Sequence, residues 1–346
     1  MADNAVSTAV FWTATTEVDP AVLTLRILYK IFTQYVFAVV VVLALFGNVM
    51  SILVTVQKDN RKISTCNYMT ALAVVDSNVT IAHGWALAWI FWAPAEDAPS
   101  ELAMQGMWYL SYTSAILSGF YLAAMTIDRL IVVRFPMSAP RLCTSRRACI
   151  TIAAIFVFFC SINVYMFFTF KIVESEYTGG TSMVKIQVPD DPDFEVLGNA
   201  YQLAIGTIAP FCIIVFCNLW IIYVLRKAAK ETGKMGVNKD GQKTREKETA
   251  YLTRMLILVS IAYVVTSIPF RLYDVISVIP PVRVHYKMEE EYWSLRFYCQ
   301  HFIIIQFWEL NYGINFYLYC IGGGKKYRDD VKQRLRQMFS CCACRN

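Results

Sequence analysis

Residues 102–133 read LAMQGMWYLSYTSAILSGFYLAAMTIDRLIVV, an apolar stretch with no charged side chain before Asp128 and Arg129. About 20 apolar residues suffice to cross the roughly 30 Å hydrocarbon layer of a membrane as a helix, so this stretch predicts a membrane span. Charges at the edge of hydrocarbon are costly unless they are paired or reach water, which makes this pair a candidate functional site. The alternative is an arginine that only anchors a helix end in the water layer.

The rest of the chain repeats the apolar pattern and predicts an all-α membrane protein. Hydrophobic residues make up 57% and charged residues 17% of 346, a balance typical of proteins that cross the membrane several times. No ten-residue segments alternate in the manner of a β-barrel. Seven segments are predicted to span the membrane: 30–56, 66–92, 103–133, 147–170, 197–226, 248–280 and 296–321.

The distribution of charge between the loops predicts the orientation. Short loops on the cytoplasmic side of a membrane carry an excess of lysine and arginine. The loops after the first, third and fifth spans are basic, whereas those after the second and fourth are rich in aspartate and glutamate. We therefore expect an outer segment at 1–29, a seven-helix domain at 30–321 and a cytoplasmic segment at 322–346, in the plasma membrane. The net charge of +6 then faces anionic lipid, which explains it without a nucleic-acid partner.

The last segment has an amphipathic pattern. Its apolar residues share one helical face, with lysines and arginines on the other: Tyr327, Val331, Leu335, Met338 and Phe339. This pattern predicts a helix that lies along membrane lipid. Cys341, Cys342 and Cys344 follow it directly and suit S-palmitoylation. A metal cluster is the alternative, but no nearby histidine or acidic residue supports it.

Short motifs occur in order within the predicted spans: Gly47-Asn48, Leu72-Ala-Val-Val-Asp76, Asp128-Arg129, Pro210, Pro269 and Asn315-Phe-Tyr-Leu-Tyr319. Together they resemble the rhodopsin-like (class A) G-protein-coupled receptors over nearly the whole chain. The resemblance implies a seven-helix bundle with its N-terminus outside. It also implies a receptor that binds an extracellular ligand and activates a heterotrimeric G protein by outward movement of helix six.

The chain departs from the family pattern at several places: Leu130 replaces a tyrosine, Phe316 a proline, Met104 a cysteine, Phe156 a tryptophan and Asn218 a tyrosine. Thr266-Ser267-Ile268 lacks a tryptophan, and the second outer loop lacks a cysteine. The bend that the proline would give to helix seven must arise elsewhere, and we expect it at Gly313. Without the tryptophan, Tyr263 or Phe270 is expected to drive the switch above Pro269.

Asp76 lies in the middle of a predicted span, where an isolated charge is so costly that it must be partnered or protonated. The resemblance implies that Asn48, Ser118, Asn311 and Asn315 converge on it. Their oxygens suit a small cation, and in the resembling family this site holds sodium. A dry hydrogen-bond network that joins the helices is the alternative.

The resemblance makes Arg129 the centre of a G-protein switch. At rest it should pair with Asp128 and reach toward Glu248 or Thr249 at the base of helix six. Pro269 removes a backbone hydrogen bond and supplies a weak point for movement of that helix. Tyr319 resembles the tyrosine that turns inward to hold the open state.

The outer halves of the helices carry the expected ligand pocket. Ser111 stands where amine receptors carry aspartate, and Glu309 where opsins carry the retinal lysine, so neither ligand class is expected. The predicted pocket residues are Trp108, Ser111, Tyr112, Gln202, Phe270, Arg271, Asp274, His301 and Glu309. Arg271 and Glu309 either form a salt bridge between helices six and seven or bind a polar ligand group such as a peptide terminus.

Two stretches resemble invertebrate neuropeptide receptors of the FMRFamide-receptor-like group, namely RLIVVRFP from Arg129 and SIPFR from Ser267. A peptide ligand is therefore expected, and the acidic outer loop would steer a basic peptide toward it. A small-molecule chemosensory receptor of the same fold is the alternative. A transporter is a remote one, since no repeated halves are visible. No nucleophile lies at a suitable spacing from a base, so we expect no enzyme and no cofactor beyond the possible sodium ion.

Overall fold

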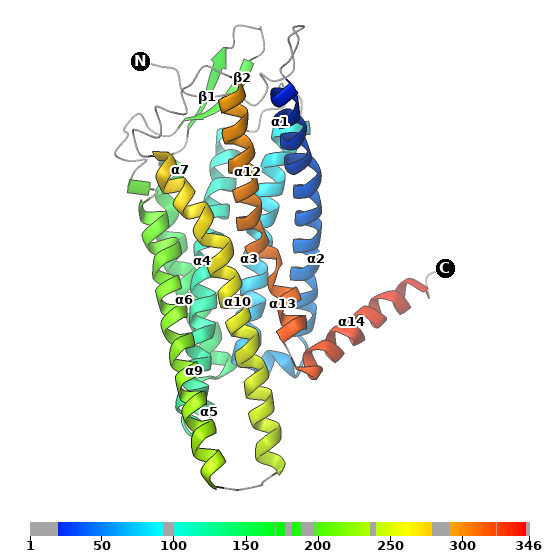
Figure 1. Cartoon of the computed structure of the whole chain (residues 1–346), viewed down its shortest axis with the longest axis vertical. Helices are drawn as coiled ribbons and strands as arrows, with labels where there is room; N and C mark the ends of the chain where they lie inside the picture. Colours follow the sequence, from blue (N-terminus) through cyan, green and yellow to red (C-terminus); the bar gives the residue numbers. More distant parts are fainter. Residues whose placement is uncertain are drawn as a thin grey trace.

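The computed structural model describes residues 20–92, 100–169, 171–176, 182–187, 197–198, 200–235, 240–278, 291–322 and 324–343. Within these ranges the chain forms a bundle of long helices packed side by side, with a small β-hairpin at one end (Figure 1). The C-terminal helix leaves the opposite end of the bundle and points away from it.

The elements follow one another along the chain with these bounds: α1 (Pro20–Lys30), η2 (Ile31–Val36), α2 (Phe37–Thr55), η3 (Asn60–Lys62), α3 (Ser64–Trp92), α4 (Glu101–Arg134), α5 (Ala139–Leu142), α6 (Ser145–Ile162), η5 (Asn163–Tyr165), α7 (Met166–Thr169), β1 (Lys171–Glu176), β2 (Ser182–Gln187), η6 (Gln202–Ile208), α9 (Ala209–Met235), α10 (Asp240–Val278), α12 (Glu291–Gly313), α13 (Asn315–Gly322) and α14 (Lys325–Ala343).

Five helical segments of the described chain are long and apolar enough to cross a membrane: Leu23–Thr55, Leu102–Arg134, Ser145–Tyr165, Gln202–Ala228 and Arg254–Tyr273. The other two predicted spans are helical as α3 and α12–α13 but are not among these five. Large apolar side chains such as Leu43, Phe158 and Trp220 are exposed on the outside of the bundle. Such a surface fits contact with lipid better than contact with water.

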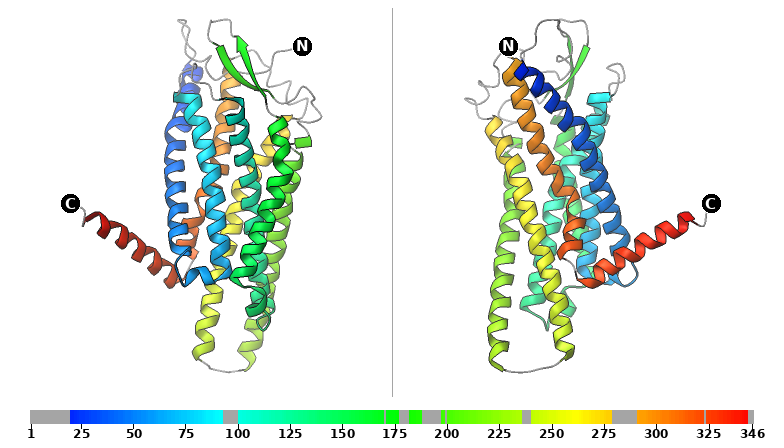
Figure 2. Two further views of the ribbon diagram at one scale, coloured as in Figure 1. Left: turned by 180° about the vertical axis from the view of Figure 1, so that it is seen from behind. Right: turned by 45° about the vertical axis from the view of Figure 1, so that its right-hand side comes forward.

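Helix α4 occupies the centre of the bundle and packs against α3, α6 and α9 (Figure 2). Its long apolar sequence places Leu117, Tyr121 and Met125 in the core, all nearly or fully buried. Its first turn is capped by Ser100, whose Oγ accepts a hydrogen bond from the Ala103 N–H at 3.3 Å. A side-chain oxygen at this position satisfies one of the unpaired N–H groups at a helix start.

The β-hairpin was not predicted from the sequence, which indicated only an acidic loop after the fourth span. Strands β1 and β2 pair antiparallel, with Lys171 opposite Gln187 and Glu176 opposite Ser182. The strands lie at the end of the bundle where α12 and α1 begin (Figure 1). A short hairpin of mixed polar and apolar residues carries too little periodic signal to separate it from a loop.

Candidate functional site

The predicted polar core forms around Asp76 of α3, whose side chain is completely buried. Ser118 Oγ of α4 donates to Asp76 Oδ1 at 2.6 Å, and Asn315 Nδ2 of α13 donates to Asp76 Oδ2 at 2.8 Å. One carboxyl group thus joins three helices through two hydrogen bonds. Buried polar groups are retained at low cost only when they are bonded in this way.

Two of the predicted partners do not bond to Asp76. Asn48 of α2 instead donates its side-chain amide to the Tyr312 carbonyl at 2.9 Å. Asn311, the residue before Tyr312, is also buried, but no hydrogen bond joins it to Asp76 in the described part of the chain. Of the four residues expected around Asp76, Ser118 and Asn315 therefore bond it, whereas no hydrogen bond among the described residues joins Asn48 or Asn311 to it.

The Asn48 bond explains how helix seven bends without its proline. Helix α12 ends at Gly313 and α13 starts at Asn315, so the break falls at the glycine that the sequence indicated. A Cβ atom on Gly313 would lie 2.5 Å from the Ala44 Cβ, closer than two such atoms can approach. Gly313 therefore lets the bent helix lie directly against α2, and Asn48 bonds a carbonyl at the bend.

The acid–base pair near the C-terminal end of α4, the end predicted to face the cytoplasm and called the inner end below, is buried. Arg129 Nη2 lies 3.7 Å from Asp128 Oδ2, and Ser64 Oγ of α3 donates to the same carboxylate oxygen at 2.8 Å. Only 6% of Arg129 is exposed, and its Nε has no hydrogen-bond partner within the described residues. This excludes the alternative of an arginine reaching into water. The side chains of Glu248 and Thr249, its other predicted partners, lie outside the described ones.

Cys143, in the loop before α6, also contacts this pair. Its thiol donates to the Asp128 carbonyl at 3.4 Å. Burial raises the pKa of the Cys143 thiol to about 12, and the charge of the Asp128 carboxylate acts in the same direction. The thiol therefore stays neutral at physiological pH. Neither Ser64 nor Cys143 was identified from the sequence, because both belong to other helices or loops and form no motif with Asp128.

Tyr319 of α13 lies in the core at the inner end of the bundle, with 1% of its surface exposed. Its ring meets the Tyr327 ring of α14 edge to face, with centroids 6.1 Å apart. Close by, a Cβ on Gly322 would lie 2.9 Å from the Cα of Met255 on α10. The inner ends of α10 and α13 are thus in direct backbone contact.

Pro269 lies inside α10, as predicted. Six residues earlier, Tyr263 is buried, and its hydroxyl donates to the Gly206 carbonyl at 3.4 Å. Gly206 lies four residues before Pro210, which has no N–H to bond this carbonyl. The proline of helix five therefore leaves an acceptor that a tyrosine of helix six fills. This contact supports the expectation that Tyr263 takes part where the tryptophan is missing.

Four polar residues, called the outer charge cluster below, are arranged differently from the prediction: His83, Ser111, Arg271 and Glu309. Glu309 of α12, with 1% exposed, bonds His83 Nδ1 of α3 and not Arg271. The second ring nitrogen of His83 bonds Ser111 Oγ of α4 at 2.8 Å. The salt bridge expected between Arg271 and Glu309 is therefore wrong. Helix α12 is instead joined through its glutamate to α3 and α4.

Among its contacts, Arg271 lies over two aromatic rings. Its guanidinium lies 5.4 Å from the Phe270 ring centre and 5.2 Å from that of Trp308 on α12. The Phe270 and Trp308 rings are stacked, with centroids 4.6 Å apart and planes 19° from parallel. A buried guanidinium over a ring face is attracted by the negative charge of that face. Trp308 was missed from the sequence because it forms no known spacing with Pro269.

The remaining predicted pocket residues lie on α4 and at the start of helix five. The Trp108 and Tyr112 rings of α4 are 5.6 Å apart, centre to centre. Gln202 is buried, and neither atom of its amide has a hydrogen-bond partner among the described residues. The side chains of Asp274 and His301 lie outside the described ones. Phe270 and Arg271 contact the Trp308 ring, and Ser111 and Glu309 are joined through His83, whose ring lies 5.1 Å from that of Trp308.

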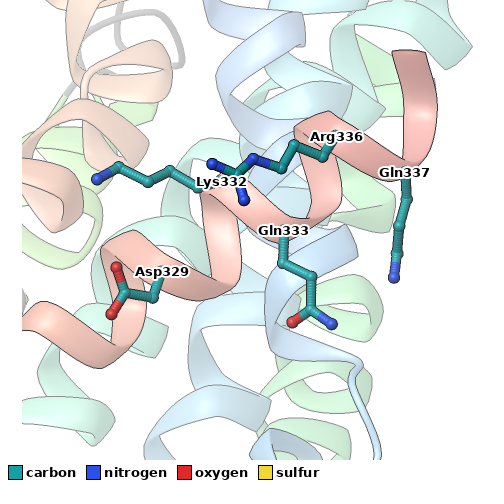
Figure 3. Close-up of a pocket in the computed structure, with 5 residues that line it drawn as sticks. All are labelled: Asp329, Lys332, Gln333, Arg336 and Gln337. Atoms are coloured by element: carbon teal, nitrogen blue, oxygen red, sulfur yellow. The ribbon is translucent and has the colours of Figure 1, made fainter. Parts of the chain in front are cut away.

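The amphipathic helix predicted after span seven is present as α14. Val331 is buried, and Tyr327 and Leu335 pack with it against Met50 and Val54 of α2. Asn60 Nδ2 bonds Asp330 Oδ2 at 3.0 Å, which fixes α14 to the first inner loop. An open pocket lies along its polar face, and Figure 3 shows the side chains that line it, namely Asp329, Lys332, Gln333, Arg336 and Gln337. The side chains of Cys341, Cys342 and Cys344 lie outside the described ones.

Apolar helices long enough to cross a membrane, joined by buried polar groups and with a buried arginine near one end, fit a helical membrane protein. Residues 47–308 match the family of "7 transmembrane receptor (rhodopsin family)", which is three quarters of the chain. The chain belongs to this family, whose members are generally not enzymes. It is a multi-pass membrane protein.

Two curated relatives are receptors for thyrotropin-releasing hormone. The chain is 28% identical to that of Gallus gallus and 27% identical to that of Mus musculus, over 127 residues in each case. The matched region covers 35% of this chain and 30% of each relative, so the chain matches less than a third of their length. These relatives are not FMRFamide-receptor-like proteins, so that finer resemblance has no support from them.

Proposed function

We propose that the chain is a peptide-activated receptor of the plasma membrane that activates a heterotrimeric G protein by outward movement of α10. In this proposal α1 to α13 cross the membrane seven times, the N-terminus is outside and the C-terminus is cytoplasmic. The orientation is supported by the basic loops and by α14, whose lysines and arginines would face anionic lipid. Lipidation at Cys341, Cys342 and Cys344 would hold α14 to the membrane.

The buried Arg129 is the observation that carries the G-protein part of this proposal. Its guanidinium has one ionic neighbour, at 3.7 Å, and an Nε without a hydrogen-bond partner in the described residues. A buried donor that lacks a partner costs about 1–3 kcal/mol, and more when it is charged. An incoming G-protein helix could supply carbonyl acceptors once α10 leaves α13. The resting structure therefore holds a charged donor ready for a partner.

The peptide part of the proposal rests on the relatives and on charge. Both curated relatives are named for a peptide hormone, thyrotropin-releasing hormone. The second long outer loop of this chain carries several aspartates and glutamates, which favour approach of a basic or amidated peptide. A small-molecule ligand is the alternative, and the same assay separates the two.

We further propose a sodium ion at Asp76 as an inactive-state ligand. Asp76 and Ser118 offer carboxylate and hydroxyl oxygens, and Asn48 Oδ1 is buried with no partner in the described residues. Hard oxygen donors of this kind suit a small cation. The ion would add positive charge that neutralises the buried carboxylate. If sodium binds, replacing NaCl by choline chloride will raise agonist affinity in the wild type but not in Asp76→Asn.

Cells that express the chain should be exposed to a panel of amidated peptides, thyrotropin-releasing hormone among them, with calcium and cyclic-AMP readouts. We expect a saturable response to at least one peptide, absent in untransfected cells and in Arg129→Ala at equal surface expression. A response to small-molecule fractions but to no peptide would favour the alternative ligand class. An undiminished response in Arg129→Ala would remove the proposed switch.

A further inference from the structure

Trp308 of α12 occupies a position that joins the outer charge cluster to the mobile helix α10. It is 5% exposed, and its ring stacks on Phe270, the residue directly after Pro269. Phe270, next to Pro269 on α10, thus has an aromatic partner. That partner, Trp308, lies on α12 and not on α10 itself. Offset-stacked rings stabilise a contact beyond the area that they bury.

The other sides of the Trp308 ring are also occupied. The His83 ring of α3 lies 5.1 Å from it, and the Arg271 guanidinium lies 5.2 Å from its centre. His83 in turn bonds Glu309, the next residue of α12. The ring therefore contacts two members of the outer charge cluster, His83 and Arg271. Any ligand that displaces His83, Glu309 or Arg271 must change the surroundings of Trp308.

Toward the inner side, residues of α12 and α13 connect Trp308 to the polar core around Asp76. Trp308 and Tyr312 are one helical turn apart and meet edge to face at 5.1 Å. The Tyr312 carbonyl accepts the Asn48 bond, and Asn315, a further turn along, bonds Asp76. Trp308 and Tyr312 share one face of α12, and Asn315 follows directly after the break between α12 and α13. A shift at Trp308 therefore acts on residues that fix the bend and the carboxylate.

We propose that Trp308 is the positioning residue that transmits a change in the outer charge cluster to α10 and to the polar core. The proposal rests on the proposed function, since it assigns a route to that activation. The stacked pair occurs together with a closed inner end, where the backbone of α10 approaches Gly322. Stacking of Phe270 on Trp308 thus belongs to the resting state, and its loss releases α10.

The test compares Trp308→Leu and Phe270→Leu with Phe307→Leu, a matched control on the same turn whose ring is 51% exposed. Membranes with equal amounts of each receptor are mixed with purified heterotrimeric G proteins, and nucleotide exchange is measured without ligand. Losing the stacked pair should raise basal exchange roughly two- to tenfold in both variants. The double variant should gain no more than either single variant. Trp308→Phe, which keeps a ring, should restore most of the resting level.

Equal basal exchange in the wild type and Trp308→Leu would overturn the proposal, as would effects that multiply in the double variant. A general loss of packing would lower thermal stability without raising exchange. If the wild type exchanges no more nucleotide than Arg129→Ala, the proposed function has failed instead. In that case the rate of amide hydrogen exchange at the inner half of α10 tests the proposed route through Trp308, because this measurement needs no G protein. Faster exchange in Trp308→Leu supports the route, and unchanged exchange rejects it.

Discussion

The inner and outer halves of the bundle hold their buried charges in different ways. At the inner half, neutral side chains bond the carboxylates at 2.6–2.8 Å: Ser118 and Asn315 bond Asp76, and Ser64 bonds Asp128, which Arg129 also approaches at 3.7 Å. In the outer half, Glu309 and Arg271 meet a histidine and aromatic rings. Neutral donors fix a carboxylate in one geometry, whereas an imidazole and ring faces can accept a competing charged group. The inner half is therefore suited to a switch between fixed states, and the outer half to recognition.

The largest effect in this comparison is expected at the inner half. Arg129→Ala should abolish agonist-stimulated nucleotide exchange while leaving ligand affinity within about threefold, since the removed group lies far from the outer cluster. Radioligand or labelled-peptide binding and nucleotide exchange in the same membranes measure the two quantities. Arg134→Ala is the control, because Arg134 is exposed five residues later on the same helix. Equal signalling by Arg129→Ala and Arg134→Ala would refute the role of the buried charge.

The second prediction concerns the outer half. His83→Ala leaves the buried Glu309 without this hydrogen-bond partner, and an unpaired buried polar group costs about 1–3 kcal/mol. We expect a lower midpoint of thermal unfolding and less receptor at the cell surface. The exchange His83→Glu with Glu309→His should recover part of both. A double-mutant cycle of Arg271→Ala and Glu309→Ala should give no coupling energy. A coupling energy as large as that between His83 and Glu309 would show that Arg271 and Glu309 do form a salt bridge.

A third, smaller effect returns to the inner half. In Gly322→Ala the new methyl group meets the Met255 backbone at 2.9 Å, so α10 must move away from α13. Crowding of this kind costs the closed state about 1 kcal/mol, which should raise basal nucleotide exchange about fivefold. Gly106→Ala is the control, because a Cβ there meets nothing within 4 Å. Basal exchange that falls or stays level in Gly322→Ala would show that the two inner ends do not restrain activation.

The smallest effect is chemical and is measured by thiol labelling alone. Because the pKa of Cys143 is raised to about 12, its thiolate is scarce below that pH, and only the thiolate reacts with iodoacetamide. Labelling of the Cys143 peptide, followed by mass spectrometry, should remain slow from pH 7 to about pH 9. Asp128→Asn removes one of the groups that raise this pKa, so labelling should become faster at each pH. No acceleration would mean that burial alone protects the thiol.

The inner half was largely predictable from the sequence, because its residues form fixed spacings along single helices. Asp76, Asp128-Arg129 and the break at Gly313 were all found in this way. Their partners were less accessible. Asn48 was assigned to Asp76, yet it bonds Tyr312, since the direction of its side chain depends on a helix break that sequence spacing does not describe.

The outer half was less predictable for a physical reason. Glu309 was paired with Arg271 because the two lie on consecutive spans at similar depth. The actual partner, His83, depends on the rotation of α3 about its axis, and a helix that is apolar on most sides carries little signal for that rotation. The stacking partner of Phe270 was missed for the same reason. The hairpin β1–β2 was missed because its strands are short.

The bend of helix seven has one further consequence. A proline bends a helix permanently, because the missing N–H is part of the covalent chain. Here the bend is held by Asn48, a residue of another helix, through one hydrogen bond at 2.9 Å. In this protein the bend between α12 and α13 therefore depends on their packing against α2. Any motion that separates α2 from α12 and α13 also removes this hydrogen bond. The seventh helix can then straighten, so its shape depends on contact with α2.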